Sequence, residues 1–593
     1  MGGGLVASSA LTPRRGRTVR CAFANPAPLD SSQRGVWYSL SLRERGRVRG
    51  KAACNSQGLG ALCGVELCIP SLRVADSIGS SQARWFAERF FPLTPALSLR
   101  AFYYPQMIFD VCTCTSTGCV FYRWMLQLVA SARSTQSAPD QWAVHEFGRC
   151  QMSDQRLTKR LARIASAFAR QPTATIPQAC GGWTSAKAAY RFFENQSVEP
   201  EQILQGHQHA TLERLRAHRI VLALQDTTSL NYSTHRATQG LGPISTRGHR
   251  TVGLLAHSTL AVTPTGQALG LIHHRCHARS EVGSAKERHQ RPVEQKESVK
   301  WLQSLGACQQ LAPQCPQTLL VNIADREGDL YELFAQATAT VRHPVHLLVR
   351  ARHDRKLATP KSRRLWQWLR RQPVLANLQV RVPRRQDQAP RVATLRVRFA
   401  PARLRPPGRK PKLPVLTLWA IEACEENPPK GVEPIHWRLL STLAVPTVQA
   451  ALEKIQWYSL RWQIEVMHKI LKSGCQIEQR QLTTARRLQR VLAVDLVVAW
   501  RLLSVCKAAR ETPTAPASDW FSKQEWQALW CVTFGQSRPP GKPPSVREFV
   551  RRAAQLGGFL ARNSDGEPGP ITLWRGLQRL NDLSLMWKIC HGK

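Results

Sequence analysis

Acidic residues are scarce in this chain. Its 593 residues contain 39 Asp and Glu against 83 Lys and Arg, which gives a formal net charge of +44 and an isoelectric point near 10.7. A charge of this size opposes compaction unless a polyanion shares the surface. The composition therefore favours a nucleic-acid partner over an anionic membrane.

Long apolar runs and targeting segments are also missing from the sequence. No stretch reaches the roughly 18 uninterrupted apolar residues of a membrane-spanning helix. No apolar block of the signal-peptide type follows Arg14, Arg15 and Arg17. These absences predict a cytoplasmic protein with no membrane partner. The sequence also has no internal repeat and no Walker or GxGxxG phosphate loop.

The first 139 residues show no sustained helical or strand period. Cys112, Cys114 and Cys119 lie close together there, but no second pair follows at zinc spacing, so we do not expect a metal cluster. We interpret residues 1–139 as a non-core extension from a start codon placed too far upstream, with Met107 or Met125 as alternative starts. A disordered basic arm is the other interpretation.

Beyond residue 139 the patterns predict a helical module followed by an α/β domain. Helical spacing of apolar residues with a basic face marks Gln155–Arg170, and helices are also expected at Ser185–Asn195 and Pro200–Arg216. We assign residues 140–217 to a helical DNA-binding domain, with a plain helical cap as the alternative. Short apolar runs then alternate with helical segments, and we expect strands at Arg219–Gln225, Val252–Val262, Ala268–His273, Thr318–Ala324 and Val345–Arg350.

The second half of the chain predicts an insertion and further helices. Residues from about 353 to 446 are rich in Pro, Arg and Lys and contain strand-like pieces, which indicates a β-rich insertion with basic loops. Lys454–Leu482 is expected to be one amphipathic helix. Its polar face carries Tyr458, Arg461, Glu465, His468 and Lys472, and its apolar face carries Leu460, Ile464, Met467 and Leu471.

Three carboxylates form the candidate site. Asp226 and Asp325 each follow an apolar run that we expect to be a strand, and α/β sheets place their sites at strand carboxyl ends. Together with Glu465 they would repel one another unless a cation were present. Mg²⁺ prefers such oxygen ligands, and a pair of ions can cleave a phosphodiester bond.

The pattern Tyr458-x2-Arg461-x3-Glu465-x6-Lys472 resembles the YREK pattern of bacterial cut-and-paste DDE transposases, the group that includes the transposase of transposon five. The resemblance runs from about residue 140 to 585. Shorter matches support it at Gln225–Leu230, Asp325–Asp329, Lys296–Ser298, Lys300–Trp301, Asn427–Gly431, Ala188–Phe192 and Leu556–Phe559.

This resemblance implies an α/β fold with a ribonuclease-H-like core. The catalytic domain would span residues 218–510, with the β-insertion at about 353–446 inside it. The first Asp would lie on the first strand and the second on the fourth. An N-terminal helical DNA-binding module would precede this core, and a helical dimerisation domain at residues 511–593 would follow it.

The resemblance also implies roles for individual residues. Asp226, Asp325 and Glu465 would be the catalytic residues and would hold two Mg²⁺ or Mn²⁺ ions. Tyr458, Arg461 and Lys472 would contact phosphates near the transposon end. A further set would contact DNA, with the tryptophan near a flipped base and the arginines at phosphates: Trp437, Arg350 and Arg352. For Trp437 the alternative is a core tryptophan on a strand. His468 lies outside the family pattern, and no catalytic role is expected for it.

The implied function is cut-and-paste transposition of an insertion sequence through a hairpin intermediate. The partners would be the terminal inverted repeats of the transposon, target DNA and a second copy of the chain, in the bacterial cytoplasm at the nucleoid. One alternative is a catalytically inactive relic that acts as a DNA-binding repressor. Another is a magnesium-dependent nuclease of the same fold, although the YREK residues argue against it.

Overall fold

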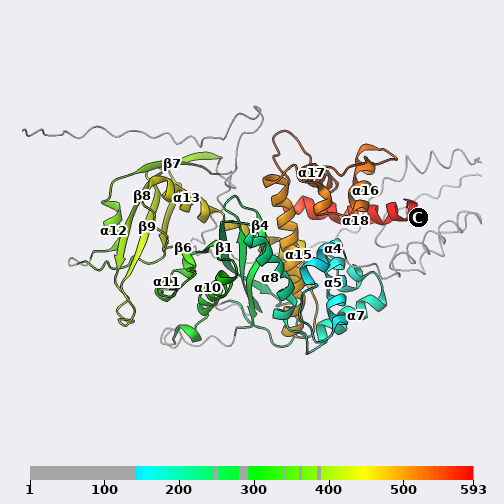
Figure 1. The fold of residues 1–593 in the computed structure, drawn as a ribbon, viewed down its shortest axis with the longest axis horizontal. Coiled ribbons are helices and arrows are strands. Elements are labelled where there is room, and N and C mark those ends of the chain that lie inside the picture. Colours follow the sequence, from blue (N-terminus) through cyan, green and yellow to red (C-terminus); the bar gives the residue numbers. More distant parts are fainter. Residues whose placement is uncertain are drawn as a thin grey trace, which may run out of the picture. The chain divides into compact units, whose positions relative to one another are not determined.

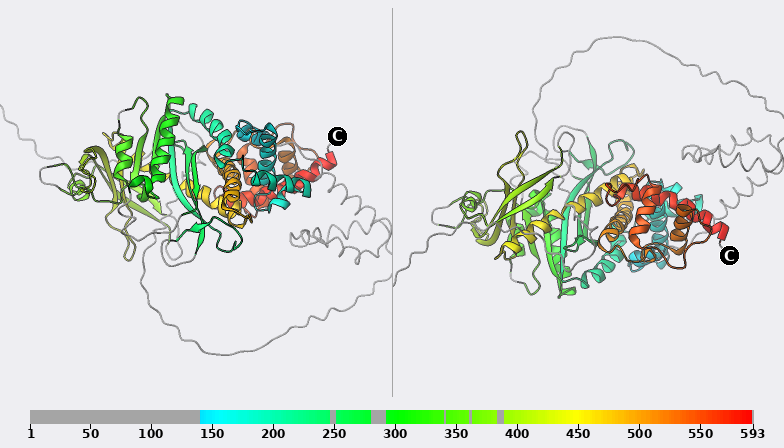
Figure 2. Two further views of the ribbon diagram at one scale, coloured as in Figure 1. Left: turned by 90° about the horizontal axis from the view of Figure 1, so that it is seen from below. Right: turned by 90° about the horizontal axis from the view of Figure 1, so that it is seen from above.

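The computed structural model describes residues 140–245, 251–279, 292–339, 341–359, 363–382 and 389–591 (Figures 1 and 2). The predictions for residues 1–139, including the alternative starts and the cysteine cluster, lie outside these ranges. Within these ranges, none of the helices combines the length and apolar character needed to cross a membrane.

The described chain begins with a helical module. It contains α4 (Gln141–Phe147), α5 (Gln155–Arg170), α6 (Ile176–Cys180), α7 (Trp183–Glu194) and α8 (Pro200–Arg216). Helix α5 starts at Asp154, whose side chain accepts the backbone N–H of Arg156, and buries Leu161, Ile164 and Phe168. Its other face leaves four cations exposed: Arg156, Lys159, Arg160 and Arg163. The helices predicted from periodicity in this segment are therefore present.

A buried carboxylate connects α4 to α8 inside this module. Glu146 is 4% exposed and accepts hydrogen bonds from Nδ1 of His207 at 2.5 Å and from the Arg214 guanidinium at 2.7 Å. The other ring nitrogen of His207, Nε2, accepts the backbone N–H of Leu271 on β4. Burial lowers the pKa of His207, so its imidazole is neutral and carries its proton on Nδ1.

A mixed sheet with helices on its faces follows the module. Its first part contains β1 (Ile220–Asn231), β2 (Gly242–Pro243), β3 (Val252–Val262), β4 (Ala268–His277), β5 (Leu319–Ala324) and β6 (His346–Arg350). Strands β1, β3 and β4 form an antiparallel meander, whereas β5 runs parallel to β1 and β6 parallel to β5. All five longer strands predicted from apolar runs are present, because buried strands of this kind read as continuous apolar sequence.

The predicted insertion extends the same sheet. It contains α12 (Leu365–Arg370), β7 (Ala376–Val382), β8 (Arg391–Leu404), β9 (Leu416–Glu425) and β10 (His436–Ser441). Strand β10 pairs antiparallel with β6, so the order across the sheet is β2-β3-β1-β5-β6-β10-β9-β8-β7, with β4 on β3. Helices α10 (Val299–Leu311), α11 (Tyr331–Ala337) and α12 bury one face of the sheet through a core that includes Val221, Trp301 and Leu347.

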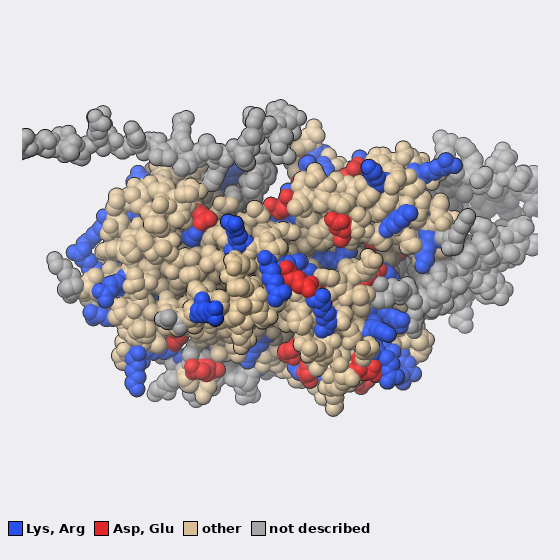
Figure 3. Space-filling view, in the orientation of Figure 1, with Lys and Arg blue, Asp and Glu red and all other residues tan. Residues whose placement is uncertain are grey.

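The remaining chain is helical. It contains α13 (Val448–Ser459), α14 (Trp462–Lys469), α15 (Ala485–Glu511), α16 (Lys523–Phe534), α17 (Val546–Leu556) and α18 (Pro570–His591). Helix α15 is buried along most of its length, because it packs against the N-terminal helices, β4, α17 and α18. Figure 1 shows α15 between the sheet and these helices. Figure 3 shows Lys and Arg spread over the visible face, with acidic side chains among them.

The prediction of one continuous helix over Lys454–Leu482 is wrong. Helix α13 ends at Ser459, α14 starts at Trp462, and a π-helical turn η5 covers Ile470–Gly474. Between α13 and α14 the backbone N–H groups of Leu460 and Arg461 bond to the carbonyls three residues earlier. Such a tightened turn shifts the helical phase without changing the apolar residues, so periodicity does not reveal it. Ile464, Met467 and Leu471 are buried as predicted, whereas Leu460 is half-buried.

Candidate active site

Asp226 and Asp325 lie beside each other on neighbouring parallel strands. The last paired residues of β1 and β5 are Leu224 and Ile323, and each Asp lies two residues further along its strand. Side chains two residues apart in a strand point to the same face. Both carboxylates therefore point to the face of the sheet opposite α10 and α11, which cover the side of Val221 and Leu347.

The prediction that the first strand ends at Asp226 is wrong, because β1 continues to Asn231. Residues Asp226 to Asn231 remain paired with β3, from Ser258 to Gly253. Strand β5 has already ended at Ala324, so this part of β1 has a partner on one side only. Polar side chains can then reach solvent, and the apolar run that marks a buried strand stops before the strand does.

Helix α14 brings Glu465 and Arg461 to this edge. It packs on β1 and β3, with Ile464 and Met467 fully buried beneath it. The guanidinium of Arg461 lies 3.7 Å from the Asp226 carboxylate and forms an ion pair with Glu465. Because the Arg461 side chain is only 14% exposed, these charges interact in a poorly solvated environment, where their attraction is stronger than in water.

The three carboxylates influence one another electrostatically. Burial raises the pKa of Asp325 to about 6, with a further increase from Asp226 and an opposing effect of Arg461. Burial also raises the pKa of Glu465, and Asp226 and Asp325 add to that increase. Although burial opposes the charge of Arg461, Tyr458 and the carboxylates raise its pKa. The site therefore concentrates negative charge around one cation.

The donor atoms at this site suit a hard divalent cation. Carboxylate oxygens are the ligands that Mg²⁺ and Mn²⁺ prefer. Added positive charge would offset the burial and the repulsion between carboxylates that raise the pKa of Asp325 and Glu465. In the ranges that the structure describes, no group of three or more His, Cys, Asp and Glu side chains is arranged so that it could hold a metal ion. Arg461 provides the compensating charge in this conformation.

The predicted phosphate contacts differ in accessibility. Tyr458 is 6% exposed and Trp437 is 5% exposed, and their rings pack edge to face with centroids 6.0 Å apart. The Trp437 indole is thus part of the core in this conformation and is not available to stack on a base. Arg350 follows Val349, which pairs with Ala324, so Arg350 lies next to Asp325 across the sheet edge. The Nζ atom of Lys472 is partly exposed and donates to the Ser229 carbonyl at 2.6 Å.

Asp329 is a buried residue near the site that the sequence patterns did not indicate as a site residue. It is 2% exposed, and one carboxylate oxygen lies 2.6 Å from the Arg355 guanidinium. The other oxygen accepts the backbone N–H groups of Arg352 and His353, at 2.6 and 2.8 Å. Asp329 therefore fixes the loop after β6, which presents the exposed Arg352 side chain beside Arg350. The second aspartate of the Asp325–Asp329 motif was the available signal in the sequence.

His468 lies closer to the site than expected. Its Nδ1 atom is 3.7 Å from the Asp226 carboxylate, and the residue is 4% exposed. The spacing of three residues from Glu465 places both side chains on the same face of α14. That spacing was visible in the sequence, but it does not distinguish a residue that contacts the site from one on a solvated face.

Two protein-family models match this chain, one near each end of the described residues. A family model for transposase DNA-binding matches residues 139–198, which include α4 to α7, and a family model for the Tn5 transposase dimerisation domain matches residues 497–585. Together the two matches support a DNA transposase of the Tn5-like kind, which confirms the resemblance drawn from the YREK pattern. The two domains also support DNA binding and dimer formation.

One solved structure is also similar. A piggyBac transposase synaptic complex with hairpin DNA matches over 65% of this chain and 76% of its own chain, with 9% sequence identity and a TM-score of 0.30. This TM-score is too low to support a conclusion about the fold or the reaction.

Proposed function

We propose that this transposase cuts and joins DNA with Asp226, Asp325 and Glu465 as its catalytic carboxylates. The observation that carries the proposal is their common interaction with Arg461, although the three acids come from β1, the end of β5 and α14. The pKa values of Asp325 and Glu465 are raised, and acids with perturbed pKa values are concentrated at functional sites. Their location at the edge where parallel strands end also favours a functional role.

The strand arrangement supports a ribonuclease-H-like core. Among the longer strands, Asp226 lies on the first, β1, and Asp325 follows the fourth, β5. The insertion strands β7 to β10 fall between Asp325 and Glu465. This is the order that the resemblance to the YREK transposases implies.

The metal cofactor would be Mg²⁺ or Mn²⁺, as two ions held by Asp226, Asp325 and Glu465. When bound, the ions would activate a water or 3′-hydroxyl nucleophile and stabilise the leaving oxygen of the phosphodiester. Arg461 would orient Glu465 and Asp226 through the contacts of its guanidinium with both carboxylates. Lys472, Arg350 and Arg352 would hold backbone phosphates at the edge of the site, because Arg offers two parallel donors and Lys a point charge.

The DNA substrate would be the terminal inverted repeats of an insertion sequence, followed by a target duplex. The exposed cations of α5 suit the first contact, because they lie on the domain that matches the transposase DNA-binding family. A second protomer would dock on the C-terminal helical domain, whose sequence matches the Tn5 dimerisation family over residues 497–585. The cut-and-paste course and its hairpin intermediate follow from the resemblance of Tyr458, Arg461, Glu465 and Lys472 to the YREK pattern.

An excision assay tests this function. Linear DNA that carries the element's own terminal repeats is incubated with the full chain and Mg²⁺, and the products are separated under denaturing conditions. We expect double-strand breaks with hairpin ends, and no cleavage when the metal is chelated. Specific binding without cleavage would instead identify a DNA-binding repressor. Nicked products that never form hairpins would identify a nuclease.

A further inference from the structure

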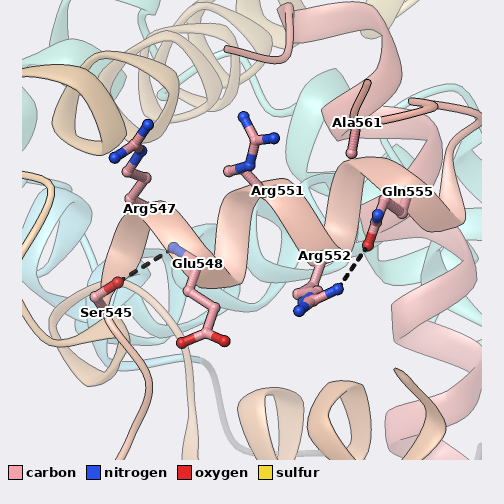
Figure 4. A pocket seen from close by; sticks show the side chains of 7 residues that line it. All are labelled: Ser545, Arg547, Glu548, Arg551, Arg552, Gln555 and Ala561. Carbon is pink, nitrogen blue, oxygen red and sulfur yellow. Dashed lines mark hydrogen bonds between the residues drawn. The ribbon is translucent and has the colours of Figure 1, made fainter. Parts of the chain in front are cut away.

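A groove lies along the exposed side of α17, in the domain that matches the Tn5 dimerisation family. Its volume is about 440 Å³, and it is lined by Ser545, Arg547, Glu548, Arg551, Arg552, Gln555 and Ala561. Figure 4 shows Arg547 and Arg551 on one side of the helix axis and Glu548 and Arg552 on the other. We call this feature the α17 groove.

Positive charge dominates the α17 groove and the loops beside it. Residues 535–569 contain six Lys and Arg against three Asp and Glu. Arg547 and Arg551 share one carboxylate, that of Glu567, at 2.8 and 3.6 Å. Because each guanidinium carries five N–H donors, both retain donors for a further anion. The Arg547 side chain is 51% exposed and that of Arg551 is 29% exposed.

Packing holds these arginines on a rigid support. The opposite face of α17 buries Phe549, Val550 and Ala553 in the C-terminal core. Helix α18 lies so close that a Cβ added at Gly576 would overlap the Ala553 carbonyl oxygen. A row of cations on a fixed helix suits a regularly charged polymer better than a small mobile anion, because the spacing of the charges is set before binding.

We propose that the α17 groove binds the phosphate backbone of duplex DNA, independently of sequence. The groove would add a second DNA contact to that of the N-terminal module, in a domain that the family description assigns only to dimerisation. This inference rests on the proposed function solely in that the substrate is DNA. It requires neither the catalytic carboxylates nor cleavage. Arg551 and Arg552 would contact phosphates, and Glu567 would compete with the phosphates for the guanidinium group of Arg551.

The salt dependence of DNA binding tests the proposal. The full-length chain is titrated into a fluorescent duplex of arbitrary sequence at several NaCl concentrations. In the double variant Arg551→Gln/Arg552→Gln, the pair between Arg547 and Glu567 remains and helix propensity is retained. Each lost phosphate contact reduces the slope of log K against log salt by about 0.9. We therefore expect a slope that is less steep by about 2. The matched control is Lys523→Gln, an exposed cation of α16 outside the groove, and its slope should equal that of the wild type.

An unchanged slope in the double variant would overturn the proposal. So would a loss of dimers in sedimentation at an unchanged slope, because the groove would then contact protein. If the double variant does not fold, Glu567→Gln provides a second test, since it frees two guanidinium groups for phosphate. It should bind DNA more tightly and with a steeper slope, and equal or weaker binding would refute the inference. DNA binding through the groove without any cleavage would refute the catalytic proposal only.

Discussion

Removal of the Asp329 carboxylate should release the loop that carries Arg352. Asp329→Ala leaves the Arg355 guanidinium, whose side chain is 8% exposed, without its counter-ion. It also leaves the backbone N–H groups of Arg352 and His353 without their acceptor. Loss of one partner from a buried ion pair costs about 3–5 kcal/mol. The variant can avoid much of this cost by opening the loop after β6 and exposing Arg355 to water. The rest of the fold tolerates this opening, because the pairing of β6 with β10 does not involve the loop.

Hydrogen exchange measured by mass spectrometry reports this opening directly. A local destabilisation of 3–5 kcal/mol would accelerate exchange at the amides of Arg352 and His353 by roughly 10² to 4 × 10³-fold, since each 1.4 kcal/mol is a factor of about ten. The matched control is Glu327→Ala, whose side chain is 63% exposed and should contribute within about 0.5 kcal/mol. Unchanged protection of the two amides in Asp329→Ala would refute the role assigned to Asp329.

Two further perturbations test the packing of the N-terminal module and of the C-terminal helices. Burial opposes the charge of Glu146, but His207 and Arg214 outweigh it and lower its pKa below the usual value near 4.5. The folded state is therefore stabilised above pH 4.5 and loses this contribution as the pH falls below it. Urea midpoints measured between pH 3 and 6 should fall steeply in the wild type and less in Glu146→Gln, and equal slopes would contradict this. Gly576→Ala should lower the free energy of unfolding by about 1–3 kcal/mol, because its Cβ would overlap the Ala553 carbonyl oxygen and force α17 and α18 apart. A urea midpoint equal to that of the wild type would contradict the close approach of these helices.

Much of the sheet could be predicted from apolar runs, but the full length of β1 could not. The runs before Asp226 and Asp325 are buried on both faces of the sheet, and burial on both faces produces continuous apolar sequence. Beyond Asp226, β1 keeps one neighbour only, and its residues become polar while its hydrogen bonds continue. Sequence patterns record burial directly and hydrogen bonding only indirectly.

In the candidate site, the sequence predicts contacts between residues that are close in the chain but not contacts between residues that are far apart. Spacing on one helix connects Arg461 to Glu465, four residues later, and the two form an ion pair. Local spacing cannot reveal that Tyr458 packs against Trp437, because these residues come from α13 and β10. The partners of Asp329 lie 23 to 26 residues away in the chain. Contacts between residues far apart in the chain depend on how the strands pair, and local sequence patterns do not reveal that pairing.

The rate of DNA-end cleavage in a single turnover tests the central claim most directly. Wild type, Asp226→Asn, Asp325→Asn and Glu465→Gln are compared on the same prebound DNA, with Glu433→Gln, an exposed acid of the insertion, as the control. Loss of a metal-ligating carboxylate removes several kcal/mol of transition-state stabilisation, so each site variant should bind DNA normally and cleave about 10³-fold more slowly or worse. The control should match the wild type. Cleavage within tenfold of the wild-type rate in any of the three variants would contradict the assignment of that carboxylate.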